Sequence, residues 1–392
     1  MNDDLEPGCL ARLFSDQSPD AFLDGHWPDR HLVCHGPLER LGALAELEAF
    51  SNLDVLLRTY RDKVRIALPD KRDEHSSLQV DAMTAAALHR NGMALILNGV
   101  ERFFPLVDQW LHELRKELGL PLKCDPRSII YVTPAGAGNS PHFDANANFI
   151  VQLRGTKRWR VAPNRHVPHP TDRWAMNETG LSEELQGYVD GPLPTELPDD
   201  AEVFDLEPGS VLFVPRGAWH STEADEDTLA LNFTFGQPTW ADLVLVGLRR
   251  RLLKDGDWRE LATGLTSRDA ARAEACKATL IEKLASLQRE VEQLSPSEIT
   301  EAFDEAPWYQ LVAEGFLRVE DGKVLASVGD DETFEIDADE SLHEVLGWLG
   351  EQGTPFSAAA MAPHFPELAS GLPGLLETLE SKGLLERHRA GR

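Results

Sequence analysis

The sequence has 392 residues, a formal net charge of −28, 42% hydrophobic residues and nine tryptophans. This apolar content is ample for buried cores and excludes an intrinsically disordered chain, and the length predicts two or three domains. So negative a surface repels phosphate backbones. We therefore expect no DNA partner and favour a basic protein or peptide.

The four cysteines, Cys9, Cys34, Cys124 and Cys276, are scattered and form no CxxC pair or metal-finger spacing. This usage is typical of free thiols in a reducing compartment. The first residues are acidic and contain no apolar run, and no stretch approaches the roughly 20 apolar residues that span a bilayer. We therefore expect a cytoplasmic protein with no signal peptide and no membrane partner.

Before residue 128 the sequence mixes helical and strand patterns. Leu41 to Leu57 keeps Leu or Ala at helical spacing, which predicts a helix on the outside of the core. Met93 to Asn98 predicts a buried strand. From Phe104 to Leu118 apolar residues recur at helical intervals, and Gly119 supplies a stop with Pro121 just beyond it.

From Ser128 to Phe235 short β-rich runs replace the helical period, separated by Gly, Pro and Asn turns. This pattern is typical of an antiparallel sandwich or barrel. A polar insert from Asn164 to Asp200 is expected to be mostly loop. The predicted strands are Ile129–Val132, Ala147–Leu153, Arg158–Ala162, Val211–Val214 and Thr228–Phe235.

Helical patterns return after the barrel, at Trp240–Leu253 and Asp269–Leu294. We interpret residues 238–300 as a helical module for self-association and expect a homodimer. Its basic cluster Arg249–Arg251 either pairs with acidic residues of a second subunit or forms a solvated helix face.

The last part of the sequence, residues 301–392, predicts three short helices at Leu342–Leu349, Ser357–Met361 and Leu372–Leu379, followed by a turn into a strand near Lys382. This order is the pattern of a winged helix. The same residues include 19 acidic against 6 basic side chains. A structural or protein-binding role is therefore favoured over DNA reading.

The stretch most informative about chemistry is Pro141–Pro163, PHFDANANFIVQLRGTKRWRVAP. On a β-strand His142 and Asp144 would face the same side and could bind one ion. His220, which follows an apolar strand and a Pro-x-Gly turn, is a third candidate. Two histidines and one carboxylate with open positions are the ligand set of non-haem Fe(II) oxygenases. The alternative is two ordinary, partly buried histidines and an aspartate that caps a turn.

Lys157 follows the turn Arg154–Thr156 and begins a returning strand, expected to run beside the strand that carries the ligands. There it could project into the barrel and meet the far carboxylate of a dicarboxylate co-substrate. A buried lysine without a partner is costly, and a bound carboxylate would remove that cost. The alternative is a solvated hairpin lysine. Trp159 would share the face of Lys157 and is expected to pack the barrel.

The runs Tyr131–Pro163 and Gly209–Phe235 resemble the JmjC-type, cupin-like 2-oxoglutarate oxygenases, most closely the bacterial ribosomal oxygenase group. Phe22-Leu-Asp-Gly-His-Trp27 resembles the N-terminal signature of that group. The resemblance implies an α+β protein whose catalytic domain, residues 1–237, is a double-stranded β-helix barrel with N-terminal helices. A helical dimerisation module over 238–300 and a winged-helix-like domain over 301–392 would follow.

The resemblance also implies Fe(II) as the metal, with 2-oxoglutarate and O2 as co-substrates. In the family the metal is held by a histidine–aspartate–histidine triad, and a basic residue grips the distal carboxylate of 2-oxoglutarate. The implied metal-binding and catalytic residues are His142, Asp144 and His220, and the implied co-substrate-binding residues are Lys157, Tyr131, Asn148 and Asn232.

The implied activity is a dioxygenase reaction that hydroxylates a side chain of a protein, with a basic ribosomal protein as a candidate target. Three alternatives stay open: hydroxylation of another peptide such as a natural-product precursor, demethylation of methylated lysine or arginine, and a non-catalytic cupin-type binding protein. A neighbouring precursor gene would favour the first and formaldehyde release the second. The third predicts no metal-dependent consumption of 2-oxoglutarate.

Overall fold

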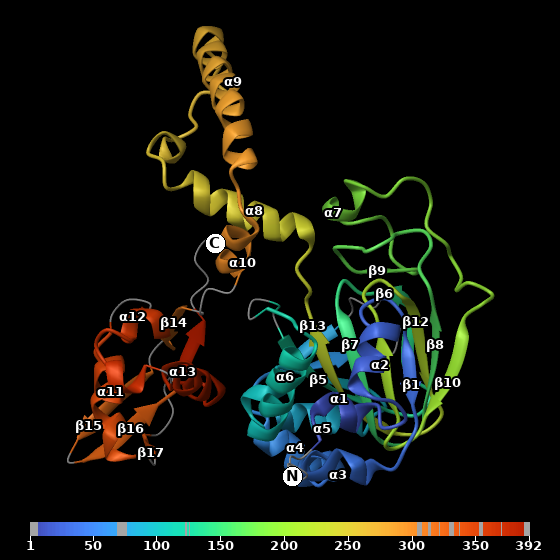
Figure 1. Ribbon diagram of the computed structural model, residues 1–392. Coiled ribbons are helices and arrows are strands. Elements are labelled where there is room, and N and C mark those ends of the chain that lie inside the picture. The colour runs from blue at the N-terminus through green and yellow to red at the C-terminus, as the bar shows by residue number, and fades with distance from the viewer. Residues whose placement is uncertain are drawn as a thin grey trace.

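The computed structural model describes residues 7–68, 77–121, 124, 126–303, 308–312, 315–320, 322–328, 333–336, 338–352, 356–369 and 371–387. Residues up to 235 and residues from 308 onward are built around separate hydrophobic cores. Three helices connect these two parts (Figure 1): α8 (Trp240–Leu252), α9 (Ala270–Glu292) and α10 (Pro296–Phe303).

Two antiparallel sheets form the barrel of the first part. The larger sheet has the order β1-β11-β7-β13-β5-β4-β2-β3, and the smaller has the order β10-β8-β12-β6-β9. The predicted α+β class with an antiparallel barrel is therefore confirmed. The strands are β1 (Leu32–Cys34), β2 (Val64–Ala67), β3 (Ser77–Val80), β4 (Ala94–Asn98), β5 (Pro126–Thr133), β6 (Gly138–Phe143), β7 (Ala147–Arg154), β8 (Lys157–Ala162), β9 (Trp174–Ala175), β10 (Glu202–Leu206), β11 (Val211–Val214), β12 (Trp219–Ala224) and β13 (Thr228–Phe235).

The turn between β7 and β8 carries the chain from one sheet to the other. β7 pairs with β11 and β13, whereas β8 pairs with β10 and with β12, the strand that carries His220. Gly155 in this turn has φ +66, and a Cβ there would lie 2.3 Å from the carbonyl oxygen of Asp227. Only glycine fits so close an approach. Lys157 therefore lies beside a ligand-bearing strand as expected, but β8 does not form a hairpin with β7.

Helices cover the outer face of the larger sheet. The helix expected at Phe104–Leu118 is confirmed as α6 (Pro105–Glu117), whose Trp110 ring stacks on Phe233 of β13 with 6.3 Å between ring centroids. Phe22 of α2 packs edge-on against Phe213 of β11 at 5.3 Å. Besides the three helices described next, this part contains α1 (Cys9–Leu13), α2 (Pro19–Gly25), α5 (Ala82–His89), α7 (Glu183–Gln186) and the 3₁₀ helix η2 (Val100–Arg102).

The single helix predicted over Leu41–Leu57 is wrong, because the chain breaks there into three short helices. Gly42 has φ +58 in the middle of the first, a backbone conformation that glycine adopts at little cost. The Asn52 side chain accepts a hydrogen bond from the Asp54 amide, so it starts a new helix. Apolar spacing runs on through these breaks. The three helices are η1 (Leu38–Leu44), α3 (Glu48–Ser51) and α4 (Leu53–Thr59).

The second part contains the three helices expected from the sequence and a strand after the turn at Lys382. They pack around a core that includes Tyr309, Leu346 and Leu376. A Cβ on Gly350 would lie 1.6 Å from the carbonyl oxygen of Leu317, so glycine is needed where α11 meets β15. The elements are β14 (Trp308–Leu311), β15 (Phe316–Glu320), β16 (Lys323–Ser327), β17 (Phe334–Ile336), α11 (Glu340–Gly350), β18 (Phe356–Ser357), α12 (Ala358–Met361), α13 (Leu372–Ser381) and β19 (Leu385–Arg387).

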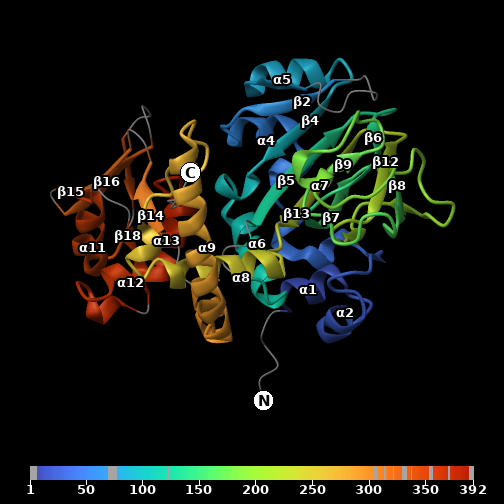
Figure 2. The same ribbon diagram turned by 90° about the horizontal axis from the view of Figure 1, so that it is seen from above.

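The connecting helices are less buried than either core. α10 packs on α8 at Gly247, where a Cβ would lie 3.0 Å from Ile299. α9 projects away from both parts of the molecule (Figure 1), and in the view from above it lies between them (Figure 2). None of its described residues is buried. Arg251 binds Glu290 and Glu298 of its own chain, so this arginine is not held free for a second subunit. In the part of the chain that the structure describes, no helix has both the length and the apolar character to cross a membrane.

Candidate metal centre

Three side chains with metal-ligating atoms meet inside the barrel. His142 on β6 pairs directly with His220 on β12, and Asp144 follows the end of β6. One ligand atom from each residue lies within 4.8 Å of the other two, and this is the one such cluster of three found among the described residues. His142 and His220 are buried and the Asp144 side chain is partly buried.

Asp144 is held in place by a different backbone contact from the one expected. We predicted that His142 and Asp144 lie on one strand, but β6 ends at Phe143. The Gly217 amide instead donates a 2.9 Å hydrogen bond to the carbonyl oxygen of Asp144. Gly217 has φ +85, and a Cβ there would lie 2.5 Å from the ring of Pro170. The Pro-x-Gly turn before His220 therefore helps to fix the aspartate as well.

Backbone hydrogen bonds orient both imidazoles in the same way. The Nδ1 of His142 lies 2.7 Å from the carbonyl oxygen of Ser140, and the Nδ1 of His220 lies 2.9 Å from that of Ala218. A carbonyl only accepts, so each Nδ1 carries the proton and each Nε2 keeps its lone pair. Nε2 of His220 lies 3.5 Å from Asp144 Oδ2. This arrangement is typical of metal-ligating histidines, whose second nitrogen is held by a hydrogen bond.

The electrostatics favour the ligand forms of these groups. Burial, with a smaller contribution from the neighbouring His220, lowers the pKa of His142 to about 3. Burial alone would raise the pKa of Asp144, but the contact with the His220 imidazole and the nearby charge of Arg173 hold this pKa below its ordinary value. At neutral pH His142 is therefore neutral and Asp144 is ionised, which are the states that bind a cation.

Lys157 lies in the same interior without a carboxylate partner. Its Nζ donates to the Thr133 hydroxyl at 3.1 Å and lies 6.0 Å from the centre of the Tyr131 ring. No ion pair forms to it among the described residues. Burial lowers the pKa of Lys157 to about 8. A buried cation with only one neutral acceptor is unfavourable, and an anionic ligand would stabilise it.

Two asparagines link this interior to the aspartate. Asn232 donates to Asn148 at 2.9 Å, and Asn148 donates to Asp144 Oδ2 at 3.3 Å. The Trp159 ring stacks on His220 with centroids 5.8 Å apart and packs in the barrel, as predicted. Its Nε1 is buried and has no hydrogen-bond partner among the described residues. A buried N–H without an acceptor costs about 1–3 kcal/mol, and a polar ligand could supply one.

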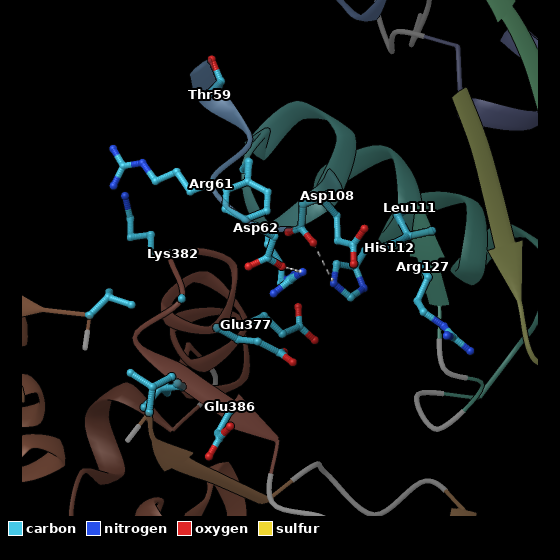
Figure 3. Close-up of a pocket in the computed structure, with 18 of the residues that line it drawn as sticks. Thr59, Arg61, Asp62, Asp108, Leu111, His112, Arg127, Glu377, Lys382 and Glu386 are labelled. Carbon is cyan, nitrogen blue, oxygen red and sulfur yellow. Dashed lines mark hydrogen bonds and ion pairs between the residues drawn. The ribbon is translucent and has the colours of Figure 1, made fainter. Parts of the chain in front are cut away.

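All seven site residues named from the sequence line one small cavity of about 40 Å³. A larger cavity of about 1320 Å³ lies between α6 and α13 (Figure 3). Acids in its lining are already engaged: Asp62 binds Arg102 and Asp108 binds His112. The chemistry of the lining, rather than the volume, therefore identifies the candidate site. The smaller cavity is lined by Tyr131, Asn139, His142, Asp144, Asn148, Ile150, Lys157, Trp159, His220 and Asn232.

Two neighbours of the site were not found from the sequence. Thr133 accepts from Lys157, and Arg173 lies 3.5 Å from Asp144. The strand alternation that places Tyr131 and Thr133 on one face could have identified the threonine. No pattern marks Arg173, because it lies in the irregular insert between residues 164 and 200.

Comparison with known proteins places this site within a family. The family model described as "JmjC domain" matches residues 111–243. YxbC of Bacillus subtilis (strain 168), itself an uncharacterized protein, is 34% identical over 300 residues, which are 75% of this chain and 91% of YxbC. Both histidines and the aspartate lie inside the matched domain.

Two similar proteins have described activities. Ribosomal oxygenase 1 of Rattus norvegicus is 31% identical over 250 residues, 60% of this chain and 38% of that protein. The bifunctional lysine-specific demethylase and histidyl-hydroxylase NO66 of Dictyostelium discoideum is 28% identical over 264 residues, 62% of this chain and 46% of that protein. The chain thus spans less than half the length of these two relatives.

Proposed function

Because this chain belongs to the JmjC-domain family, we propose that it is an Fe(II)- and 2-oxoglutarate-dependent dioxygenase that hydroxylates a side chain of a protein. One observation carries the proposal: a His–Asp–His cluster with ligand atoms within 4.8 Å of one another shares its cavity with a buried lysine that lacks a carboxylate partner. A metal site alone would fit many proteins. A metal site beside a buried, unneutralised cation fits a bound dicarboxylate.

His142, Asp144 and His220 would hold the metal through two Nε2 atoms and one carboxylate oxygen. The Nδ1 hydrogen bonds of both histidines to backbone carbonyls keep those Nε2 atoms free to ligate. Two imidazoles and one carboxylate are the set that binds non-haem Fe(II) and leaves positions open. The open positions would take 2-oxoglutarate and O2.

Lys157 would bind the distal carboxylate of 2-oxoglutarate by a charge-assisted hydrogen bond. Tyr131 would donate a second one, since burial, with the nearby charge of Asp144, raises its pKa to about 12 and keeps it a phenol at neutral pH. Asn148 and Asn232 would keep the carboxylate of Asp144 and the polar wall of the cavity in place.

When bound, Fe(II) and 2-oxoglutarate supply an O2-dependent oxidation that yields succinate, CO2 and a hydroxylated side chain. The protein contributes position and enclosure. His142 and Lys157 approach the cavity from β6 and β8 of one sheet, and Asn148 and Asn232 from β7 and β13 of the other. Enclosure between two sheets excludes water from the reacting groups, which limits side reactions.

A basic protein, with a ribosomal protein as the leading candidate, is the target that we propose. The charge of −28 favours a cationic partner, and the similar rat protein is named a ribosomal oxygenase. The name of the similar Dictyostelium protein includes both histidyl hydroxylation and lysine demethylation. Demethylation is thus the second candidate, and formaldehyde release separates it from hydroxylation. Hydroxylation of another peptide and a non-catalytic binding role are the remaining alternatives.

We further propose the domains 1–237, 238–300 and 301–392, with α10 lying across the last boundary. Exposed apolar side chains on α8 and α9, including Trp240 and Ile281, support a homodimer formed through the helical module. Three helices with short strands support a winged-helix-like C-terminal domain. Its acidic composition favours protein contact over DNA binding. A cytoplasmic location also stays a prediction.

The first test is an anaerobic titration of Fe(II) into the purified protein with 2-oxoglutarate, followed by visible absorption. We expect a charge-transfer band in the wild type, no band in His142→Ala and a weakened band in Lys157→Ala. His166→Ala, a change in the insert away from the cavity, is the matched control and should behave as wild type. No band from the wild type under any condition would leave a cupin-like binding protein as the better interpretation.

A further inference from the structure

The insert between residues 164 and 200 is built into the candidate metal site. Its strand β9 pairs with β6, so that Ala175 lies opposite His142 and Trp174 opposite Phe143. The Met176 amide donates to the carbonyl oxygen of Pro141 at 2.9 Å. Trp174 is buried against Trp219, the neighbour of His220. The residue before Trp174 is therefore held at a fixed place beside the ligands.

That residue is Arg173, which bridges two carboxylates. Its Nε lies 3.5 Å from Asp144 Oδ1, and its Nη1 lies 2.9 Å from Glu178 of the same insert. The other oxygen of the aspartate, Oδ2, faces a different way, toward His220 Nε2 at 3.5 Å and Asn148 Nδ2 at 3.3 Å. The two oxygens of Asp144 thus have separate partners.

We infer that Arg173 is a positioning residue that makes Asp144 a one-oxygen metal ligand. Oδ1 is paired with the guanidinium at 3.5 Å, and Oδ2 is the oxygen that lies 3.5 Å from His220 Nε2. A carboxylate free to rotate could bind through both oxygens and take up one of the positions that 2-oxoglutarate and O2 need. This inference rests on the proposed function, and it concerns the insert rather than the barrel.

Glu178 neutralises the charge of Arg173. An uncompensated guanidinium beside a metal site would repel the divalent cation, because like charges a few ångströms apart interact strongly where water is scarce. Glu178 contacts Nη1 of Arg173 and balances that charge, while Nε is the atom that lies 3.5 Å from Asp144 Oδ1. Partners of this kind, one shell beyond the ligands, typically change metal affinity 10–100-fold when they are removed.

The test compares Arg173→Gln, Arg173→Lys and Glu178→Gln with wild type. Arg165→Gln is the matched control: Arg165 is an arginine of the same insert, paired with Asp200 on the surface. We would measure the dissociation constant of Co(II), the visible spectrum of the Co(II) protein, and the anaerobic Fe(II)–2-oxoglutarate band. We expect Arg173→Gln to weaken metal binding about 10–100-fold and to change the Co(II) spectrum, with a smaller loss in Glu178→Gln and none in Arg165→Gln.

Arg173→Lys separates positioning from charge. Lysine keeps the positive charge but lacks the planar fork that fixes the carboxylate, so it should resemble Arg173→Gln in its spectrum. A Lys variant equal to wild type, or a folded Arg173→Gln protein with unchanged affinity and spectra, would overturn the inference and leave the proposed function intact. Failure of the wild type to bind metal would overturn both. Thermal unfolding of each metal-free variant identifies any that merely misfolds.

Discussion

In the barrel, polar side chains such as His142 and Lys157 are buried, whereas on α8 and α9 apolar side chains such as Trp240 and Ile281 face solvent, at 83% and 67% exposure. Buried polar groups and exposed large apolar groups both depart from the usual pattern of apolar interior and polar surface, and each indicates a partner that binds there. For the barrel it is a small ligand, since the buried polar groups line a cavity between the two sheets. For the helices we propose another protein surface, since exposed apolar side chains lie on both α8 and α9 and α9 projects from the rest of the molecule (Figure 1).

The largest effect is expected from Lys157→Met, which removes the buried charge without leaving a large void. Truncating one partner of a buried charge pair costs about 2–5 kcal/mol, so 2-oxoglutarate should bind at least roughly 30-fold more weakly. The metal-free protein should become more stable at pH 7, by up to about 3 kcal/mol, because Lys157 has a pKa of about 8 when folded against 10.5 as a free side chain. Isothermal titration and urea unfolding would check both. Equal stability would show that the lysine is already satisfied.

The helical module should respond to a charge on its apolar face. Ile281→Glu on α9 should weaken self-association about 10–100-fold, since burial of an isoleucine contributes roughly 1.5–3 kcal/mol. Ala275→Glu adds the same charge to the opposite face of the helix, six residues earlier, and should have no effect. Analytical ultracentrifugation measures the dissociation constants. A monomeric wild type, or equal effects of the two variants, would contradict a dimer built on this face.

The affinity for 2-oxoglutarate should depend on pH through Lys157. Only the protonated lysine binds the carboxylate, so above pH 8 the affinity should fall about tenfold per pH unit. The stability of the metal-free protein should change in the opposite sense. Between pH 8 and 10.5 the unfolded chain binds the extra proton, so stability rises with pH over that window.

Lys157→Arg is the control for both effects. Arginine stays protonated throughout this range, so its 2-oxoglutarate affinity should be flat where that of the wild type falls. Parallel profiles for the two proteins would assign the titration to another group.

The smallest effect is expected at the start of α8. The Thr239 hydroxyl accepts from the Asp242 amide, and the Asp242 carboxylate accepts from the Thr239 amide, which together form a capping box. Thr239→Ala should destabilise this helix by about 1 kcal/mol, measured as faster hydrogen exchange of α8 amides. Exchange in β7 and β13 should be unchanged, because those strands belong to the barrel core. Equal acceleration in both would show that the two regions unfold together.

Local patterns identified most elements. The apolar spacing of α6 and the β-rich runs of β7, β8, β11 and β13 were all correct, because each depends on residues close in sequence. The broken helix over 41–57 was missed, since Gly42 and Asn52 interrupt a spacing that otherwise continues. The short strand β9 has no pattern of its own and exists because β6 offers it a pairing edge.

The order of residues along the chain was enough to identify the groups that carry the chemistry: two histidines, an aspartate and a lysine in runs that resemble one family, with enough apolar residues to bury them. Tertiary structure decided how they meet. In the folded protein β8 pairs in the sheet opposite to that of β7, and the Gly217 amide binds the carbonyl oxygen of Asp144. Arg173, in an insert with no recognisable sequence pattern, lies within 3.5 Å of that aspartate. The two kinds of information differ in the sequence separation over which they act. Periodicity and turn propensity act over a few residues, whereas the pairing of distant strands depends on the packing of the whole barrel.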